Sequence, residues 1–154
     1  MANIIVRPAQ QADWQTIADF NIRLAWETEE KQLDPEIVGP GVRAVLADPT
    51  RGRYFVACQE EQIVGQLMHT KEWSDWRNGD IWWLQSVYVA EKYRRRGVFR
   101  SLLAHLINEA EADPQIVGIR LYVETDNQRA HQTYEKLGLT QAGYFVMERI
   151  FPVR

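Results

Sequence analysis

VYVAEKYRRRGVFRSLL, residues 87–103, joins three features that together predict the architecture of the chain. It begins with the end of an almost wholly apolar run, residues 81–89, as expected of a strand buried on both faces. A short loop with three consecutive arginines follows and ends at Gly97. Apolar residues then recur at helical spacing, at Phe99, Leu102, Leu103, Leu106, Ile107 and Ala110. The stretch therefore predicts a buried strand, a basic loop and a long amphipathic helix in direct succession.

The junction of loop and helix has the properties of an anion-binding site. The first N–H groups of a helix lack partners within the helix, and the helix dipole adds positive potential there. Gly97 lets the backbone approach a ligand closely. Charge and bidentate donors come from Arg94, Arg95, Arg96 and Arg100. The loop is short and suits a pyrophosphate; neither GxxxxGK[ST] nor GxGxxG occurs, which disfavours an NTPase or Rossmann site.

The remaining elements predict one α/β domain, residues 1–154, with a mixed central sheet flanked by about four helices. Other helices are predicted at 11–26, from Asp34-Pro35 to Asp48, and from Thr125 or Asp126 to Gly138. Gly39-Pro40-Gly41 is expected to break or kink the second of them. Residues 71–80 are expected to be a polar loop. Strands are predicted at 4–6, 54–58, 63–70, 81–89, 119–123 and 141–151.

Composition narrows the class of protein further. Hydrophobic residues make up 45% and charged residues 25%, as in soluble globular proteins. The net charge of −3 disfavours nucleic-acid binding, although the arginine triplet leaves a nucleic-acid contact as an alternative. Cys58 is the only cysteine, so no internal disulfide can form. With no apolar run long enough to span a bilayer and no signal-peptide pattern, a cytoplasmic location is expected.

Two motifs resemble those of the GNAT superfamily of N-acetyltransferases. Its pyrophosphate loop follows Q/R-x-x-G-x-G/A, which Arg94 and Gly97 match, whereas Phe99 stands where Gly or Ala is usual. Its later pattern N-x-x-A-x-x-x-Y-x-x-x-G-F is matched over residues 127–139, except that Leu139 replaces the final Phe. The order of elements over nearly the whole chain is similar as well.

The resemblance implies a GNAT-like fold, acetyl-CoA as acyl donor, no metal, and direct transfer to an amine without an acyl-enzyme. Backbone groups of Val87 and Val89 would bind the pantetheine arm, and those of 95–99 the pyrophosphate. Asn127 would contact the cofactor arm, and Tyr134 would be the general acid that protonates the leaving thiolate. A merely packed aromatic is the alternative for Tyr134. The implied cofactor-binding residues are Val87, Tyr88, Val89, Arg94, Arg95, Arg96, Gly97, Val98, Phe99, Arg100, Asn127 and Tyr134.

The acceptor is predicted to be a small primary amine. Residues 26–30 and 72–80 are acidic and aromatic, which would suit a cationic, polyamine-like acceptor. The chain is similar here to diamine and polyamine acetyltransferases, but Gln85 stands where they commonly carry a glutamate base, and glutamine cannot take a proton. The base candidates are Glu27, Glu72, Glu124 and an ordered water. We favour a water positioned by Glu27, which makes Glu27 the second catalytic candidate.

Several alternatives stay open at this stage. The same fold could bind or sense acyl-CoA without catalysis. Trp73 and Trp76 lie in a polar segment and would supply contact area for a homodimer or a pocket. Cys58 is expected to be a buried small hydrophobe, and His105 a surface residue. The three histidines, His69, His105 and His131, show no metal-ligand spacing.

Overall fold

The computed structural model describes residues 3–152 and divides them into two compact units, one that ends at Tyr122 and one that begins at Val123. No helix among these residues is long and apolar enough to cross a bilayer. The second unit contains one helix, α4 (Gln128–Lys136). The first unit contains β1 (Ile4–Pro8), α1 (Trp14–Glu29), α2 (Pro35–Ala47), β2 (Arg53–Gln59), β3 (Gln62–Ser74), β4 (Gly79–Val89), α3 (Val98–Ala112) and β5 (Ile116–Leu121), with short 3-10 helices at η1 (Gln11–Asp13) and η2 (Glu91–Tyr93).

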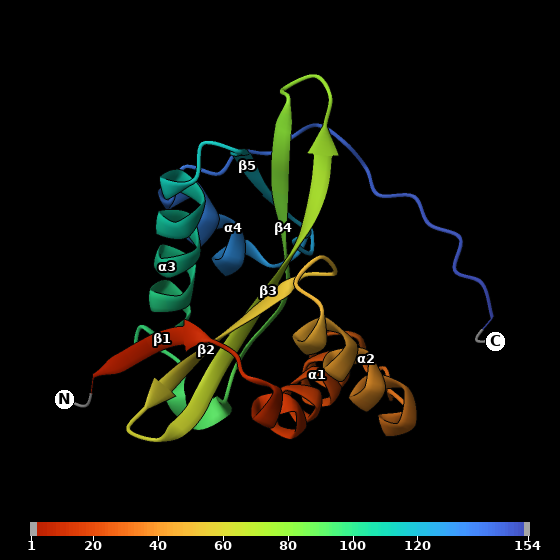
Figure 1. Cartoon of the computed structure of the whole chain (residues 1–154), viewed down its shortest axis with the longest axis vertical. Coiled ribbons are helices and arrows are strands. Elements are labelled where there is room, and N and C mark those ends of the chain that lie inside the picture. The colour runs from red at the N-terminus through yellow and green to blue at the C-terminus, as the bar shows by residue number, and fades with distance from the viewer. Residues whose placement is uncertain (1–2, 153–154) are drawn as a thin grey trace. The chain divides into compact units, whose positions relative to one another are not determined.

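The five strands form one mixed sheet in the order β1-β2-β3-β4-β5 (Figure 1). The first four are antiparallel neighbours, whereas β5 runs parallel to β4. The parallel pair is joined through α3, as a parallel crossover requires. The α/β class, the mixed sheet and the four α-helices predicted from the sequence are confirmed. The single-domain boundary at 1–154 stays a prediction.

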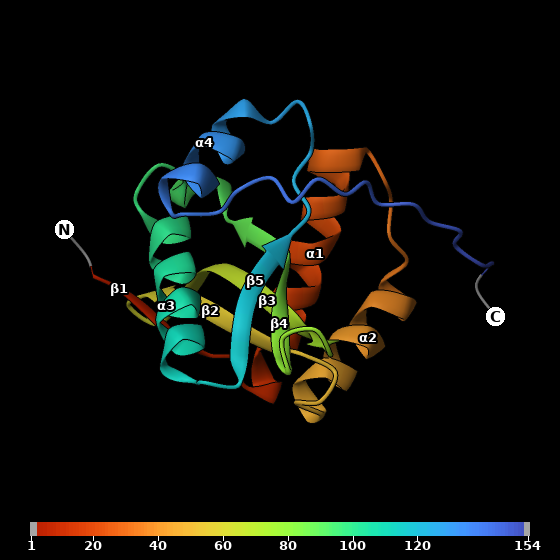
Figure 2. The same cartoon turned by 90° about the horizontal axis from the view of Figure 1, so that it is seen from above.

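Helices cover both faces of this sheet. Figure 2 shows α3 on one side and α1 with α2 on the other. Neighbouring residues of β2 illustrate the division, because side chains alternate between faces along a strand. Val56 belongs to the core beneath α1 and α2, together with Ile17 and Val42. Phe55 instead meets His105 of α3, with ring centroids 4.9 Å apart. The prediction that His105 is a surface residue is therefore wrong, because its ring packs edge-on against the sheet.

Helix α2 begins where the sequence predicts and then continues through the expected break. The Asp34 side chain accepts a hydrogen bond from the Glu36 N–H at 2.9 Å, and Pro35 occupies the first turn. Pro40 removes one hydrogen bond from the helix, yet the helix runs on to Ala47. Packing of its apolar face against α1 and β2 offsets this loss, through Val38, Val42, Val45 and Leu46.

The hairpin of β3 and β4 is longer than predicted. Residues 71–74 extend β3 and 79–80 begin β4, so only four residues remain as a turn. Trp73 and Trp76 are 62% and 86% exposed on this extension. Hairpin pairing with residues 79–82 of β4 outweighs the polar composition that predicted a loop.

The second unit departs most from the sequence-based prediction. Asn127, and not Thr125 or Asp126, caps α4: its Oδ1 accepts the N–H of Ala130 at 3.1 Å. The predicted strand at 141–151 is wrong, since no described residue from 141 to 152 belongs to a strand. A strand, unlike a helix, requires a neighbouring strand for its hydrogen bonds.

Candidate active site

A β-bulge in the middle of β4 shapes the first part of the site. The pairing of β3 with β4 slips between Gln66 and Met68, and Ser86 adopts a left-handed φ of 52°. Gln66, which is fully buried, donates from Nε2 to the Ser86 carbonyl at 3.1 Å and to Asn21 Oδ1 at 2.8 Å. Asn21 in turn donates to the hydroxyl of Tyr54 at 3.0 Å. Helix α1 and strands β2 and β3 thus hold the bulge in place.

Beyond this bulge, one edge of β4 lies open within the first unit. The last pair between β4 and β5 is Leu84 with Leu121, so among described residues up to Tyr122 no strand pairs there with residues 85–89. The N–H of Ala90 donates to Val64 on β3 at 2.9 Å. Because backbone groups alternate in direction along a strand, those of Val87 and Val89 point toward the open side. This is the edge at which the resemblance to the GNAT superfamily implies pantetheine binding, which stays a prediction.

The loop after β4 turns back on itself before α3. Arg95 has a φ of 66° and Gly97 a φ of 83°, both in the left-handed region. Gly97 precedes the first residue of α3, Val98, and a Cβ at Gly97 would meet nothing within 4 Å. The space beside Gly97 at the start of α3 is therefore open, and the binding of an anion there stays a prediction.

Arg94 joins this loop to the end of α1. Its guanidinium lies 2.6 Å from Glu27 Oε2, its Nε donates to the Val89 carbonyl at 2.9 Å, and it stacks over the Tyr88 ring at 5.3 Å. Tyr88 donates from its hydroxyl to Glu27 Oε1 at 3.3 Å. Burial disfavours the charged guanidinium, but the hydrogen bond and charge of Glu27 outweigh it and raise the pKa of Arg94. Four predicted site residues thus meet in one cluster.

The other predicted arginines are arranged differently. Arg95, Arg96 and Arg100 are exposed on the loop and the first turn of α3. Arg96 stacks over the Tyr93 ring at 5.7 Å. Within the exposed arginine triplet, Arg94 therefore pairs with Glu27 of α1, whereas Arg96 stacks on Tyr93 of η2.

A polar strip, made up of Thr70, Trp83 and Arg120, crosses β3, β4 and β5 on one face of the sheet. Direct pairing places Thr70 beside Trp83, and Trp83 beside Arg120. Arg120 Nη1 lies 2.8 Å from Glu72 Oε2, and Trp83 packs on Tyr122 with centroids 4.7 Å apart. The sequence patterns did not indicate Arg120 or Tyr122 as residues of the site. Arg120 could have been suspected because it is a charged residue within an otherwise apolar strand. Its partner, Glu72, lies 48 positions away in the sequence and so could not be identified from a local pattern.

Gln85 lies two residues after Trp83 on β4, and its side chain is therefore on the same face of the sheet. Its Nε2 donates to Thr70 Oγ1 at 2.6 Å. Gln85 is thus held in place by β3, at the point where β4 loses its pairing with β5. An acceptor on the strip would therefore lie next to the open edge of β4.

Asn127 and Tyr134 lie in the second unit. The Asn127 carbonyl oxygen caps α4, and burial raises the pKa of Tyr134 to about 12. A phenol with this pKa keeps its proton at neutral pH, as a general acid must. Their predicted contacts with the cofactor stay predictions.

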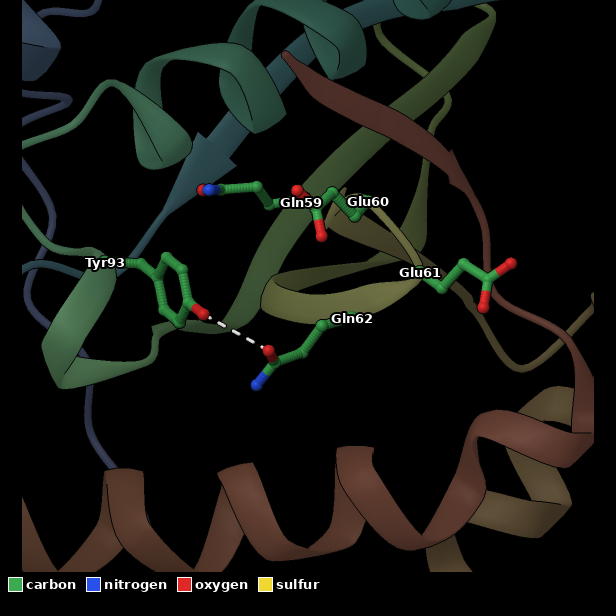
Figure 3. A pocket seen from close by; sticks show the side chains of 5 residues that line it. All are labelled: Gln59, Glu60, Glu61, Gln62 and Tyr93. Atoms are coloured by element: carbon green, nitrogen blue, oxygen red, sulfur yellow. Dashed lines mark hydrogen bonds between the residues drawn. The ribbon is translucent and has the colours of Figure 1, made fainter. Parts of the chain in front are cut away.

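A shallow hollow of about 490 Å³ lies between the turn of β2 and β3 and the 3-10 helix η2 (Figure 3). Tyr93 and Gln62 point toward one another across it and share a hydrogen bond of 3.2 Å. Glu60 and Glu61 also line it, and two carboxylates disfavour a polyphosphate ligand. No group of three or more metal-ligating side chains occurs in the described part of the chain.

Known proteins are similar to this chain in sequence and in fold. Residues 11–139 match the model of the acetyltransferase (GNAT) family. A mycothiol acetyltransferase from Corynebacterium aurimucosum is 30% identical over 86% of this chain, which spans only 43% of that longer protein. The crystal structure of a possible acetyltransferase from Clostridium difficile is 45% identical, with a TM-score of 0.90 over 97% of this chain and 99% of that one.

A more distant structure shows the fold with its ligand named. It is a predicted acetyltransferase with acetyl-CoA from Clostridium acetobutylicum, 19% identical, with a TM-score of 0.78 over 96% of each chain. At this identity the likeness concerns the fold alone. The family match over most of the residues and the close structural relative carry the assignment: the chain belongs to the acetyltransferase (GNAT) family, whose acetyl donor is acetyl-CoA.

Proposed function

We propose that the protein transfers an acetyl group from acetyl-CoA directly to a primary amine of a small acceptor. The observation that carries this proposal is the open edge of β4, which leads straight into the accessible start of α3 at Gly97. An extended pantetheine arm and a pyrophosphate would follow the same path. Cys58, the only cysteine of the chain, is buried in β2, which supports direct transfer over a thiol-bound acyl-enzyme.

Arg94 holds the pyrophosphate loop against Glu27, and the other predicted residues take part as follows. The amine nitrogen attacks the thioester carbonyl, the carbon–sulfur bond breaks, and Tyr134 donates its proton to the departing thiolate. Asn127 binds the cofactor arm. Backbone groups of Val87 and Val89 bind the pantetheine beside Tyr88. The pyrophosphate is held by the turn of Arg95, Arg96, Gly97, Val98 and Phe99, with Arg100 adding charge.

The proton of the amine goes to water. Gln85 cannot accept it, and both nearby glutamates are committed to arginines, Glu27 to Arg94 at 2.6 Å and Glu72 to Arg120 at 2.8 Å. Glu27 would then act by orienting a water. Glu124 lies in the second unit and stays a candidate base.

The same ion pairs bear on the acceptor. The sequence predicts a cationic, polyamine-like acceptor, but the arginines offset the acidic charge on which that prediction rests. Without a strong base, an amine that is already partly neutral reacts best. α-Amino groups, with a pKa of about 8, meet this condition better than alkyl amines near about 10.4. We therefore favour an α-amine that packs on Trp83 and Tyr122.

A paired-substrate assay tests the proposal. Thiol release from acetyl-CoA is measured with Phe-Ala-Ala, with N-formyl-Ala-Lys-Ala and with spermidine, and products are identified by mass. We expect acetylation of the free α-amine first. If the lysine peptide or spermidine is acetylated faster than Phe-Ala-Ala, the acceptor is a cationic alkyl amine, as the sequence predicts, and not an α-amine. Thermal stabilisation by acetyl-CoA without turnover of any amine would instead favour the alternative, a non-catalytic acyl-CoA-binding or sensing module.

A further inference from the structure

Gly65 of β3 lies where the open edge of β4 and the start of α3 come together. In the pairing of β3 with β4 it is opposite Val89, one of the residues at that edge. A Cβ added at Gly65 would lie 2.8 Å from Cγ1 of Val98, the first residue of α3. The strand edge that would bind pantetheine and the helix start that would hold the pyrophosphate therefore meet at this one position.

This position requires space and not the backbone freedom of glycine. Gly65 does not have the left-handed φ that Gly97 has, so an alanine could adopt its backbone conformation. A glycine inside a strand weakens the strand, and it commonly marks the close approach of another part of the chain. A Cβ here would also lie 3.3 Å from Cδ1 of Leu102. Because carbon atoms pack at roughly 3.5 Å or more, the missing Cβ is what admits α3 so close to β3.

The side chain of Val98 cannot make room for a larger residue by itself. Val98 is only 1% exposed, and Leu102, one turn further along α3, is completely buried. A valine in a helix has one strongly preferred rotamer, so turning its methyl groups away is unfavourable. A Cβ at Gly65 would therefore displace the backbone at the start of α3. Gly97 directly precedes Val98, so the displaced backbone includes the turn that would hold the pyrophosphate.

The residues on either side of Gly65 contact the rest of the same region. The Val64 carbonyl accepts the N–H of Ala90, directly after β4, at 2.9 Å. Gln66 donates from Nε2 to the Ser86 carbonyl at the bulge, at 3.1 Å. Three consecutive residues of β3 thus contact the end of β4, the start of α3 and the bulge.

We propose that Gly65 is a positioning residue of the cofactor site. Its missing Cβ sets how closely the start of α3 packs on β3, and so places the N–H groups that would bind the pyrophosphate of acetyl-CoA. The inference rests on the proposed function, because it concerns the same cofactor. Hydrogen bonds from N–H groups to oxygen have lengths of about 2.7–3.2 Å, so a small shift of the helix start weakens them.

Calorimetric titration with CoA tests this placement. Gly65→Ala should weaken CoA binding by about tenfold or more, because the shifted N–H groups no longer meet the phosphate oxygens at hydrogen-bond distance. Val98→Ala removes the methyl groups that the new Cβ would meet, so Gly65→Ala/Val98→Ala should bind CoA as Val98→Ala does. Gly118→Ala is the matched control on β5 of the same sheet. The nearest atom to a Cβ there, Cγ1 of Ile81, is 3.9 Å away, so this variant should bind CoA as the parent does.

The outcomes separate this inference from the proposed function. Binding of CoA by Gly65→Ala as tight as by the parent, a loss that Val98→Ala does not reverse, or an equal loss in Gly118→Ala would overturn the inference alone. A parent chain that does not bind CoA would contradict both. If Gly65→Ala is too unstable to titrate, unequal CoA affinities of the double variant and of Val98→Ala would overturn the inference.

Pantetheine distinguishes positioning of α3 from a general distortion of the site. It has the arm of CoA and lacks the pyrophosphate, and its binding is followed by NMR titration of the parent and of Gly65→Ala. We expect Gly65→Ala to lose less affinity for pantetheine than for CoA, because the substitution acts on the start of α3. An equal or larger loss for pantetheine would contradict the positioning role.

Discussion

His69 gives the sharpest test of how the core is built. It is completely buried on β3, stacks on Trp82 with centroids 3.9 Å apart and lies 6.1 Å from Phe55. Neither ring nitrogen has a well-formed hydrogen bond among the described residues. Burial first, and then the charges of Arg53 and Lys71, lower the pKa of His69 to about 4. The folded protein therefore holds this histidine neutral.

The sign and size of the effect follow from proton binding. An unfolded histidine has a pKa of about 6.5, so on acidification the unfolded chain takes up a proton before the folded chain does. The contribution of His69 to stability is complete above about pH 6.5 and is lost as the pH falls toward 4. Between pH 8 and pH 5 the loss amounts to about 2 kcal/mol in the free energy of unfolding. The backbone of Thr70 opposes this shift only weakly.

Urea unfolding at pH 8, 7, 6 and 5 measures this loss. His69→Phe keeps an aromatic ring beside Trp82 and removes the titrating group. We expect the parent to lose about 2 kcal/mol more than His69→Phe between pH 8 and pH 5. His131→Gln, in the second unit, controls for the loss of a histidine elsewhere and should follow the parent. Parallel curves for the parent and His69→Phe would refute the assignment of a neutral, buried His69.

Three further predictions concern the site and the fold. Tyr134→Phe should lower kcat by roughly 10- to 1000-fold with little change in acetyl-CoA affinity, because the ring stays and the proton is lost; loss of affinity in calorimetry would make Tyr134 a binding residue instead. Gly97→Glu should abolish thermal stabilisation by acetyl-CoA, because it places negative charge at the start of α3 and a side chain at a φ of 83°; an unchanged shift would move the pyrophosphate site elsewhere. Asp34→Ala should cost about 1 kcal/mol of stability in urea unfolding, since it removes the N-cap of α2; no loss would mean that the cap contributes nothing.

Local patterns predicted much of the first unit. The apolar stripe of α3, the buried run of β4 and the turn between β2 and β3 lie where the sequence indicates. Each depends on residues close together along the chain, because periodicity, capping and turns are local properties. At Pro40 the sequence predicts a break or a kink, and the helix does not break there because tertiary packing carries it on to Ala47.

The sequence by itself determined the α/β class and the strand–loop–helix junction at Gly97, because each element there has its own periodicity and the glycine its own backbone freedom. Only the tertiary structure decided which charges meet. Glu27 and Arg94 are 67 positions apart, and Glu72 and Arg120 are 48 apart, so no local pattern pairs them. It also decided that residues 141–151 are unpaired, since a strand depends on hydrogen bonds from a neighbour that lies elsewhere in the chain or in another copy of it.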